Sequence, residues 1–273
     1  MSSPDLATPL DIAVVLPERL NTHADVGNAD TLRKHASWGR VQLRTHFVRE
    51  PGDWPRHTDA VLLGDGALEH THAALTELLP LRDDLVEAQA RGVPMLAVGL
   101  GMHLLSASIR FADQAPLPGL GLLAGTSMEE DKQVSGELVI SRGGQIILGY
   151  ENHRLSYQRA GAESPLGVIV HPSENRDRFE GVAAGNIVGT ELHGPVLAKN
   201  PDLAVSLLTL MLERRHPGVR LHQSRSAAVA AELAAQIRLA SIRSVNLPVS
   251  LLEVERAYAW GEAGHVERVD SLS

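Results

Sequence analysis

One histidine of this sequence lies where a general base would be useful. Residues 191–195 read Glu-Leu-His-Gly-Pro and follow a short apolar run, so His193 is expected at the end of a strand. A histidine at such a position can act as a general base in a cleft, because its ordinary pKa is close to neutral pH. The alternative is a histidine that is satisfied by its neighbours and has no catalytic role.

Two glycine-rich junctions could hold a substrate or a nucleophile. Gly64, Asp65 and Gly66 follow an apolar run, where free backbone amides can bind an anion. Their spacing fits neither a dinucleotide fingerprint nor a P-loop, and a tight turn is the simpler interpretation. Residues 98–103, Val-Gly-Leu-Gly-Met-His, are typical of the strand–turn–helix junction on which hydrolases mount a nucleophile. Gly99 occupies its apex, so no nucleophile is presented, and a glycine-rich turn under a helix also accounts for these residues.

A metal site has only weak support in the sequence. Residues 69–72 read Glu-His-Thr-His, but no third ligand follows at a suitable spacing. The chain contains no cysteine, which excludes disulfides, thiolate zinc sites and any thiolate nucleophile. We therefore expect no metal and no other cofactor.

The composition is that of a globular protein without a nucleic-acid or membrane partner. The 273 residues are 44% hydrophobic and carry a formal net charge of -8, whereas a nucleic-acid binder needs a basic face. The apolar runs are too short to span a membrane, and no secretory signal is evident. We expect a cytoplasmic protein.

The elements that must position these residues alternate between strands and helices. This alternation predicts an α/β domain with a mainly parallel sheet. After Leu120, short segments separated by glycines predict an antiparallel extension. The expected strands are residues 11–16, 41–48, 59–63, 93–98, 137–140, 145–148, 167–170 and 187–190, and the expected helices are residues 28–38, 72–90, 100–109 and 202–215.

The chain is expected to have three parts. Residues 1–10 read as a disordered lead, residues 11–217 as the main domain and residues 218–273 as a helical C-terminal extension.

The extension carries an apolar stripe that needs a partner surface. Val229, Leu233 and Ile237 recur at helical spacing within residues 226–243, and a second helix is expected at residues 251–260. Such helices are marginal alone in water, so the stripe must be buried. Two surfaces could bury it. One is this chain's own domain, and the other is a partner protein that binds the outer face of the helix or the aromatic residues at positions 258 and 260.

Several short motifs together resemble one enzyme family. The motifs are residues 20–28, 118–123 (Pro-Gly-Leu-Gly-Leu-Leu), 149–153 (Gly-Tyr-Glu-Asn-His), 180–181, 189–195 and 199–201 (Lys-Asn-Pro). Taken in this order along the chain, they resemble class I glutamine amidotransferases of the cobyric-acid-synthase (CobB/CobQ) type, and most closely the GatD-like subunits of lipid II isoglutaminyl synthase. The resemblance covers about residues 12–215 and implies a three-layer, flavodoxin-like α/β fold.

The resemblance implies an activity and a partner. Members of the family hydrolyse glutamine and pass ammonia to a second protein, which for GatD is the Mur-ligase-like MurT that activates a D-glutamate carboxylate of peptidoglycan. The chemistry needs a cysteine at the elbow, which here is Gly99, and a histidine, which here is His193. By the same comparison, backbone amides of residues 64–66 and of Leu100 would bind the oxyanion.

The departures from the family concern the cleft. The glutamine that helps to seat the substrate is replaced by His103, and an arginine of the cleft falls near Gln133. A Gly-Asn-Asn loop is replaced by residues 173–175, Ser-Glu-Asn. Glycine at the elbow removes the chemistry and also relieves a strained backbone conformation. The chain therefore resembles a degenerate amidotransferase.

Three functions remain open on this evidence. The first is a non-catalytic subunit that forms a heterodimer with a Mur-ligase-like synthetase. The second is an active glutaminase or hydrolase with an unconventional nucleophile, and the third is a sensor that binds glutamine or another small molecule in the old pocket. In each case we expect the pocket to involve Gly64, Gly66, Leu100, His103 and Gln133.

Overall fold

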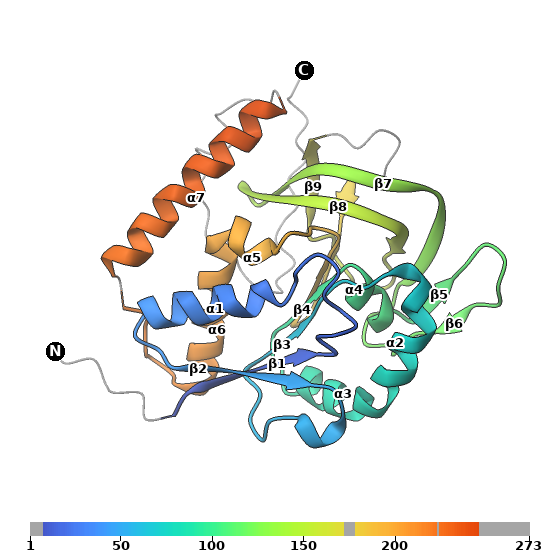
Figure 1. Cartoon of the computed structure of the whole chain (residues 1–273), viewed down its shortest axis with the longest axis horizontal. Coiled ribbons are helices and arrows are strands. Elements are labelled where there is room, and N and C mark those ends of the chain that lie inside the picture. Colours follow the sequence, from blue (N-terminus) through green and yellow to red (C-terminus); the bar gives the residue numbers. More distant parts are fainter. Residues whose placement is uncertain (1–7, 172–177, 223, 246–273) are drawn as a thin grey trace.

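A mainly parallel β-sheet with helices on both faces forms the centre of the protein. The computed structural model describes residues 8–171, 178–222 and 224–245. The central sheet has the order β11-β12-β4-β3-β1-β2, of which β1 to β4 are labelled in Figure 1. Within it only the edge strand β11 runs antiparallel to its neighbour. The three-layer α/β prediction is confirmed. The strands are β1 (Leu10–Val15), β2 (Leu43–Val48), β3 (Ala60–Leu63), β4 (Met95–Val98), β11 (Val182–Ala184) and β12 (Ile187–Thr190).

The apolar runs of the sequence become strands that are buried on both faces. In β1, Ile12 and Val14 pack on the same side as α1 and α6, whereas Ala13 and Val15 pack on the side of α2, α3 and α4. This alternation follows from the two-residue period of a strand, and it divides the core into two layers. The helices concerned are α1 (Gly27–Trp38), α2 (Thr71–Leu78), α3 (Arg82–Ala90), α4 (Leu100–Leu105) and α6 (Pro201–Arg215), with α5 (Val196–Lys199) before α6.

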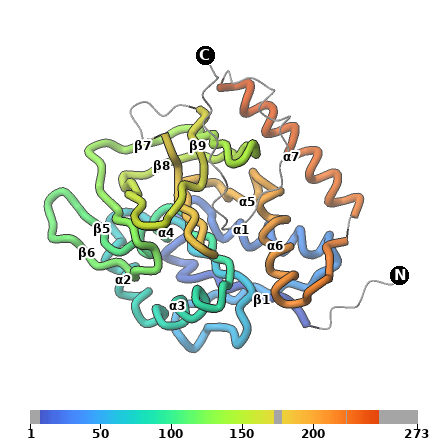
Figure 2. The backbone as a smooth tube through the Cα atoms, turned by 180° about the vertical axis from the view of Figure 1, so that it is seen from behind, coloured from blue at the N-terminus to red at the C-terminus, as the bar shows by residue number. Residues whose placement is uncertain are grey.

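A second sheet is built around a long hairpin. Its path is β10-β9-β7-β5-β6, with β8 paired to β7, and Figure 2 shows the hairpin β7–β8 beside β9, on the side of the molecule away from β1 and α3. The predicted antiparallel extension is therefore present, but the short strands expected at residues 137–140 and 145–148 are wrong in length. The strands are β5 (Ser108–Arg110), β6 (Leu117–Pro118), β7 (Thr126–Arg142), β8 (Gln145–Gln158), β9 (Gly167–His171) and β10 (Phe179–Glu180).

Two helix predictions are wrong in their bounds. The helix expected over residues 72–90 is two helices, α2 and α3, separated by a 3₁₀ turn that contains Pro80, which lacks the amide that a continuous helix needs. The helix expected over residues 100–109 ends at Leu105, because Ser106 is extended and its hydroxyl donates to the carbonyl of His103. Ile109 consequently belongs to β5.

The C-terminal helix α7 (Arg225–Ser244) packs through one side only. It contacts α1 and α6, and Arg238 Nη1 lies 2.7 Å from Asp202 Oδ2 (Figure 1). The predicted stripe faces away from these contacts, with Val229, Leu233 and Ile237 exposed by 49%, 55% and 63%. These three residues are thus not buried on the described domain, whereas Ile242, further along the same helix, is fully buried against Val139, Ile146 and Leu148 of the second sheet.

The remaining sequence expectations concern the ends of the chain. Leu10 belongs to β1, so the lead is shorter than the expected residues 1–10. Residues 1–7 and the helix expected at residues 251–260 lie outside the described residues. Among the helices that the structure describes, none combines the length and the apolar character required to cross a bilayer.

Candidate functional site

The loops that follow four parallel strands meet at one end of the central sheet. His23 follows β1, Asp65 follows β3, Gly99 follows β4 and His193 follows β12. Ligands of open α/β sheets bind at this carboxyl edge, because the loops there converge and their backbone groups are not used by the sheet. The predicted positions Gly99 and His193 are therefore neighbours, although they are far apart in the sequence.

Gly99 has the backbone conformation of an elbow, and the space beside it is filled. Its φ of +52° and ψ of −123° are conformations that side-chain-bearing residues rarely adopt. A Cβ atom on Gly99 would lie 2.6 Å from Asp65 Cγ, closer still to Asp65 Oδ1, and 2.8 Å from His193 Cε1. The volume in which a cysteine side chain would begin is therefore occupied by the carboxylate of Asp65.

The carboxylate of Asp65 also uses the backbone donor expected to bind an oxyanion. The amide of Leu100, at the start of α4, donates to Asp65 Oδ1 at 2.7 Å. The amide of Asp65 itself donates to Asp25 Oδ2 at 2.9 Å. Burial raises the pKa of Asp65, while the Leu100 amide and His23 act in the opposite direction. Two of the expected oxyanion donors are thus bound to carboxylates of the protein itself.

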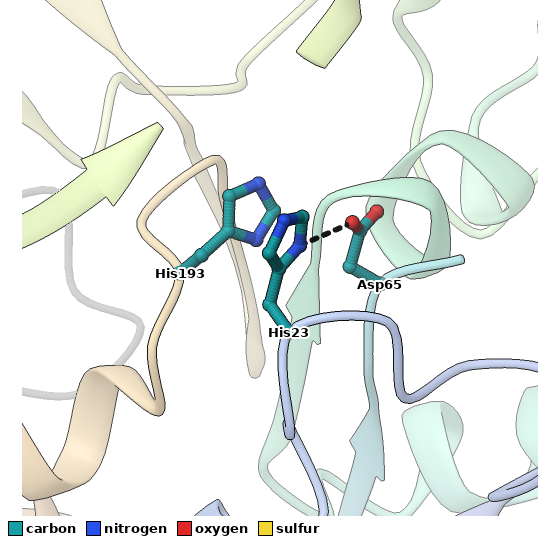
Figure 3. A group of neighbouring side chains, drawn as sticks. All are labelled: His23, Asp65 and His193. Carbon is teal, nitrogen blue, oxygen red and sulfur yellow. Dashed lines mark hydrogen bonds and ion pairs between the residues drawn. The ribbon is translucent and has the colours of Figure 1, made fainter. Parts of the chain in front are cut away.

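His193 is fully buried beside this carboxylate. Its backbone amide donates to the carbonyl of Tyr150 at 2.6 Å, which ties the loop after β12 to the hairpin. Its ring stacks on the ring of His23 with centroids 4.2 Å apart (Figure 3). Burial lowers the pKa of His193 to about 4, so the imidazole is neutral at pH 7. A neutral imidazole can accept a proton, but Gly99 offers it none.

His103 is bound inside the protein through both ring nitrogens. Nδ1 lies 2.8 Å from Ser127 Oγ, and Nε2 lies 2.7 Å from Glu191 Oε1. Burial alone would raise the pKa of Glu191, but His153 and His103 outweigh it and lower this pKa to about 2. Glu191 is therefore a buried carboxylate that remains charged, and it fixes the orientation of His103.

A pocket of about 290 Å³ lies next to this cluster. Four of the predicted positions line it, namely Gly66, Leu100, His103 and Gln133, and Gln133 Nε2 donates to Asn152 Oδ1 at 2.8 Å. Gly64 is not among the lining residues, because it packs against the backbone of Leu20. The loop of residues 173–175 lies outside the described residues.

Sequence reasoning missed the acidic and histidine side chains that fill the space beside the elbow. The glycine loop alone does not reveal the role of Asp65, although a charged residue between two glycines at the end of a buried strand is itself a signal. His23 and Glu191 lie within or beside motifs that carried the family resemblance, and no role was assigned to them. Both of these side chains line the pocket.

Comparison with known proteins identifies a family that this chain matches and relatives to which it is similar. Residues 11–201 match the family described as CobB/CobQ-like glutamine amidotransferase domain. The GatD subunit of lipid II isoglutaminyl synthase (glutamine-hydrolyzing) from Staphylococcus aureus is 29% identical over 211 residues, which cover 76% of this chain and 86% of the relative. The same subunit from Streptococcus pneumoniae is 27% identical over 221 residues, which cover 76% of this chain and 82% of the relative.

A solved structure shows the same fold. PurLQS from Thermotoga maritima contains a chain that superposes with a TM-score of 0.52 at 15% identity, covering 68% of this chain and 88% of that chain. At this identity the likeness concerns the fold alone. The family match covers well over half of the sequence, and the fold and the elbow geometry agree with it. This chain therefore belongs to the CobB/CobQ-like glutamine amidotransferase domain family.

Proposed function

We propose that this chain is a GatD-like amidotransferase subunit that does not hydrolyse glutamine and instead binds and supports a Mur-ligase-like synthetase in the cytoplasm. The reaction of the complex would be the amidation of a cell-wall precursor or of a related carboxylate. The two curated relatives are subunits of a lipid II isoglutaminyl synthase, which supports this assignment.

The observation that carries the proposal is the filled space at Gly99. A cysteine is absent from the whole chain, and the carboxylate of Asp65 occupies the volume beside the elbow. The same carboxylate accepts the Leu100 amide, so a tetrahedral intermediate would have to displace it from that donor. Loss of the nucleophile and loss of a free oxyanion donor both favour a non-catalytic role.

A surface for the partner is supported by the exposed side of α7. Leu233 and Ile237 are more than half exposed in the middle of a helix that is otherwise docked on the domain. Exposed apolar rows of this kind are typical of protein contact sites. Because the curated relatives are named as subunits, we propose the synthetase as the protein that covers this row.

An active hydrolase is the second candidate, and Asp65 is the residue that favours it. It is the carboxylate nearest to the elbow, and it lies beside the neutral imidazole of His193. An aspartate nucleophile would still need a donor for the oxyanion, whereas the Leu100 amide is bound to Asp65 itself. This competition makes the non-catalytic function the better supported one.

Ammonia release from glutamine tests the proposal directly. The purified full-length chain, alone and together with the synthetase that co-purifies from the native host, is expected to release no ammonia above the rate without protein. Release that is abolished by His193→Ala would contradict the proposal. For the partner, the expected result is a Mur-ligase-like protein in the purified complex, identified by mass spectrometry; a chain that is purified from its host without any such protein would contradict that part.

A further inference from the structure

Three side chains with metal-binding atoms converge beside the elbow. They are His23, Asp65 and His193, and one potential ligand atom of each lies within 4.8 Å of the other two (Figure 3). His23 Nδ1 is already 2.8 Å from Asp65 Oδ2. Within the part of the chain that the structure describes, this is the one group of three such residues. The residues come from three different loops, so the fold rather than local sequence brings them together.

The second observation is a buried histidine without a hydrogen-bond partner. His193 has no exposed surface, and among the described residues neither Nδ1 nor Nε2 has a partner. A neutral imidazole has one donor and one acceptor, and buried polar atoms in folded proteins are normally paired. The edge of the ring that carries Cε1, between the two nitrogens, faces Gly99 and Asp65. An unpaired nitrogen at this place is available as a ligand.

The donor set selects a class of metal ion. Two imidazole nitrogens and one carboxylate oxygen are the ligands of catalytic-type zinc sites, which keep a fourth position for water or another small ligand. Magnesium and calcium prefer sites made of oxygen ligands, so they fit this set poorly. The open position would face the adjoining pocket, which His23 and Asp65 line together with Gln133 and Asn152.

Neighbouring groups already hold the carboxylate ligand. The Leu100 amide donates to Asp65 Oδ1 at 2.7 Å, which leaves Oδ2 directed at His23. Such outer contacts orient metal ligands and strengthen binding. Asn152 Nδ2, which lies 3.2 Å from His23 Nε2, is a hydrogen-bond donor, so the Asn152 amide must turn its oxygen towards the Nε2 proton when an ion binds Nδ1.

We propose that His23, Asp65 and His193 form a site for a divalent transition-metal ion of the zinc class, in place of the missing catalytic cysteine. The ion would replace the proton shared by His23 Nδ1 and Asp65 Oδ2. The rings of His23 and His193 are stacked with an angle of 30° between them, so His23 must turn its ring edge towards the ion. Its loop position and partial exposure permit this rotation. No motif of the sequence predicts a metal at this position, and the proposal goes beyond the non-catalytic function proposed above.

The test is metal titration of the tag-free, full-length protein after removal of metals with a chelator. Zn²⁺ binding is measured by calorimetry, and Co²⁺ binding by the visible absorption bands that tetrahedral cobalt shows. One equivalent is expected to bind at micromolar concentration and to raise the melting temperature. His23→Gln and Asp65→Asn are each expected to weaken binding at least about tenfold, as loss of a ligand or of its support does. The matched control is the double variant His70→Gln/His72→Gln, which removes two exposed histidines outside the cluster and should leave binding unchanged.

Three outcomes would overturn the proposal. They are an absence of saturable binding to the wild-type chain, binding that His23→Gln and Asp65→Asn leave unchanged, and binding that is lost in the His70/His72 control. His193→Gln is measured as well, but because His193 is fully buried, the decision rests on His23, whose side chain is partly exposed, and on Asp65→Asn, which keeps the size and shape of the buried side chain. Metal binding is measured independently of ammonia release and of synthetase binding. Failure of the metal proposal is therefore distinguishable from failure of the proposed function.

Discussion

A small side chain at the elbow should destabilise the protein both through backbone strain and through Asp65. In Gly99→Ala, the new Cβ meets a backbone with φ of +52° and also the Asp65 carboxylate. The unusual backbone conformation costs about 1–3 kcal/mol. If the carboxylate is displaced from the Leu100 amide, a charge-assisted hydrogen bond worth about 1.5–3 kcal/mol is lost as well. We therefore expect Gly99→Ala to lower the free energy of unfolding by about 2.5–6 kcal/mol.

The two contributions separate in a double-mutant cycle with Asp65→Ala. In that background the overlap with Asp65 is gone and only the 2.8 Å approach to His193 Cε1 remains, so Gly99→Ala should cost mainly the backbone strain, about 1–3 kcal/mol. The coupling energy between positions 65 and 99 is then about 1.5–3 kcal/mol, as is usual for residues in contact. The matched control is Gly185→Ala, which has a φ of +57° but open space around its Cβ, and which should cost about 1–2 kcal/mol in either background.

The assay is urea unfolding of the four proteins of the cycle, followed by circular dichroism at pH 7 in buffer that contains a chelator. The reasoning is refuted if Gly99→Ala is no more destabilising than Gly185→Ala. It is also refuted if Asp65→Ala leaves the cost of Gly99→Ala unchanged, because the carboxylate would then not be the group that the new methyl displaces.

Three further predictions concern pH, catalysis and binding. Burial raises the pKa of Glu180 from 4.5 to about 7, so this group makes the wild type lose about 3 kcal/mol of stability as pH rises from 4.5 to 7. Glu180→Gln should abolish this loss, and equal pH profiles of the free energy of unfolding for both proteins would contradict the prediction. Gly99→Cys alone should release ammonia from glutamine far more slowly than about 1 per second, because Asp65 fills the site and the substrate is not held; an ordinary enzyme rate would show that the pocket is intact. The double variant Leu233→Glu/Ile237→Glu should weaken binding of the synthetase at least about tenfold in a pull-down titration without changing the melting temperature, whereas Leu79→Glu, which alters another exposed leucine, should bind normally; equal binding by both would reject α7 as the interface.

The central sheet could be predicted because its strands leave a strong pattern. The runs at β1, β3 and β4 are continuously apolar and end at proline or glycine, and the structure places these strands within two residues of the predicted bounds. The hairpin could not be predicted in full. Much of β7 between Glu129 and Glu137 is polar and exposed or half-exposed, so no apolar period marks it as a strand.

Part of the candidate site could likewise be predicted from the sequence, and part could not. Gly99 and His193 could be found because the order of short motifs fixes their positions, and the structure brings them together. The role of Asp65 depends on where its carboxylate points and on which amide it meets, and both are set by the packing of β3 against β4. No periodicity or local spacing encodes such a contact. For the same reason the pairing of His103 with Glu191 could not be read from the sequence.

The Asp65 carboxylate and a side chain at position 99 would occupy the same volume, which implies an order in which the two substitutions arose. If its ancestor carried a cysteine at the elbow, as the family resemblance implies, an aspartate at position 65 could not have entered first without pushing the thiol aside. With Asp65 oriented as it is in this structure, loss of the cysteine would have to precede the arrival of its carboxylate. Reversal of the substitution at position 99 is blocked as well, because a new cysteine there would overlap with the Asp65 carboxylate until Asp65 is replaced. Two substitutions acquired in this order would thus prevent the lineage from regaining its nucleophile by a single further substitution.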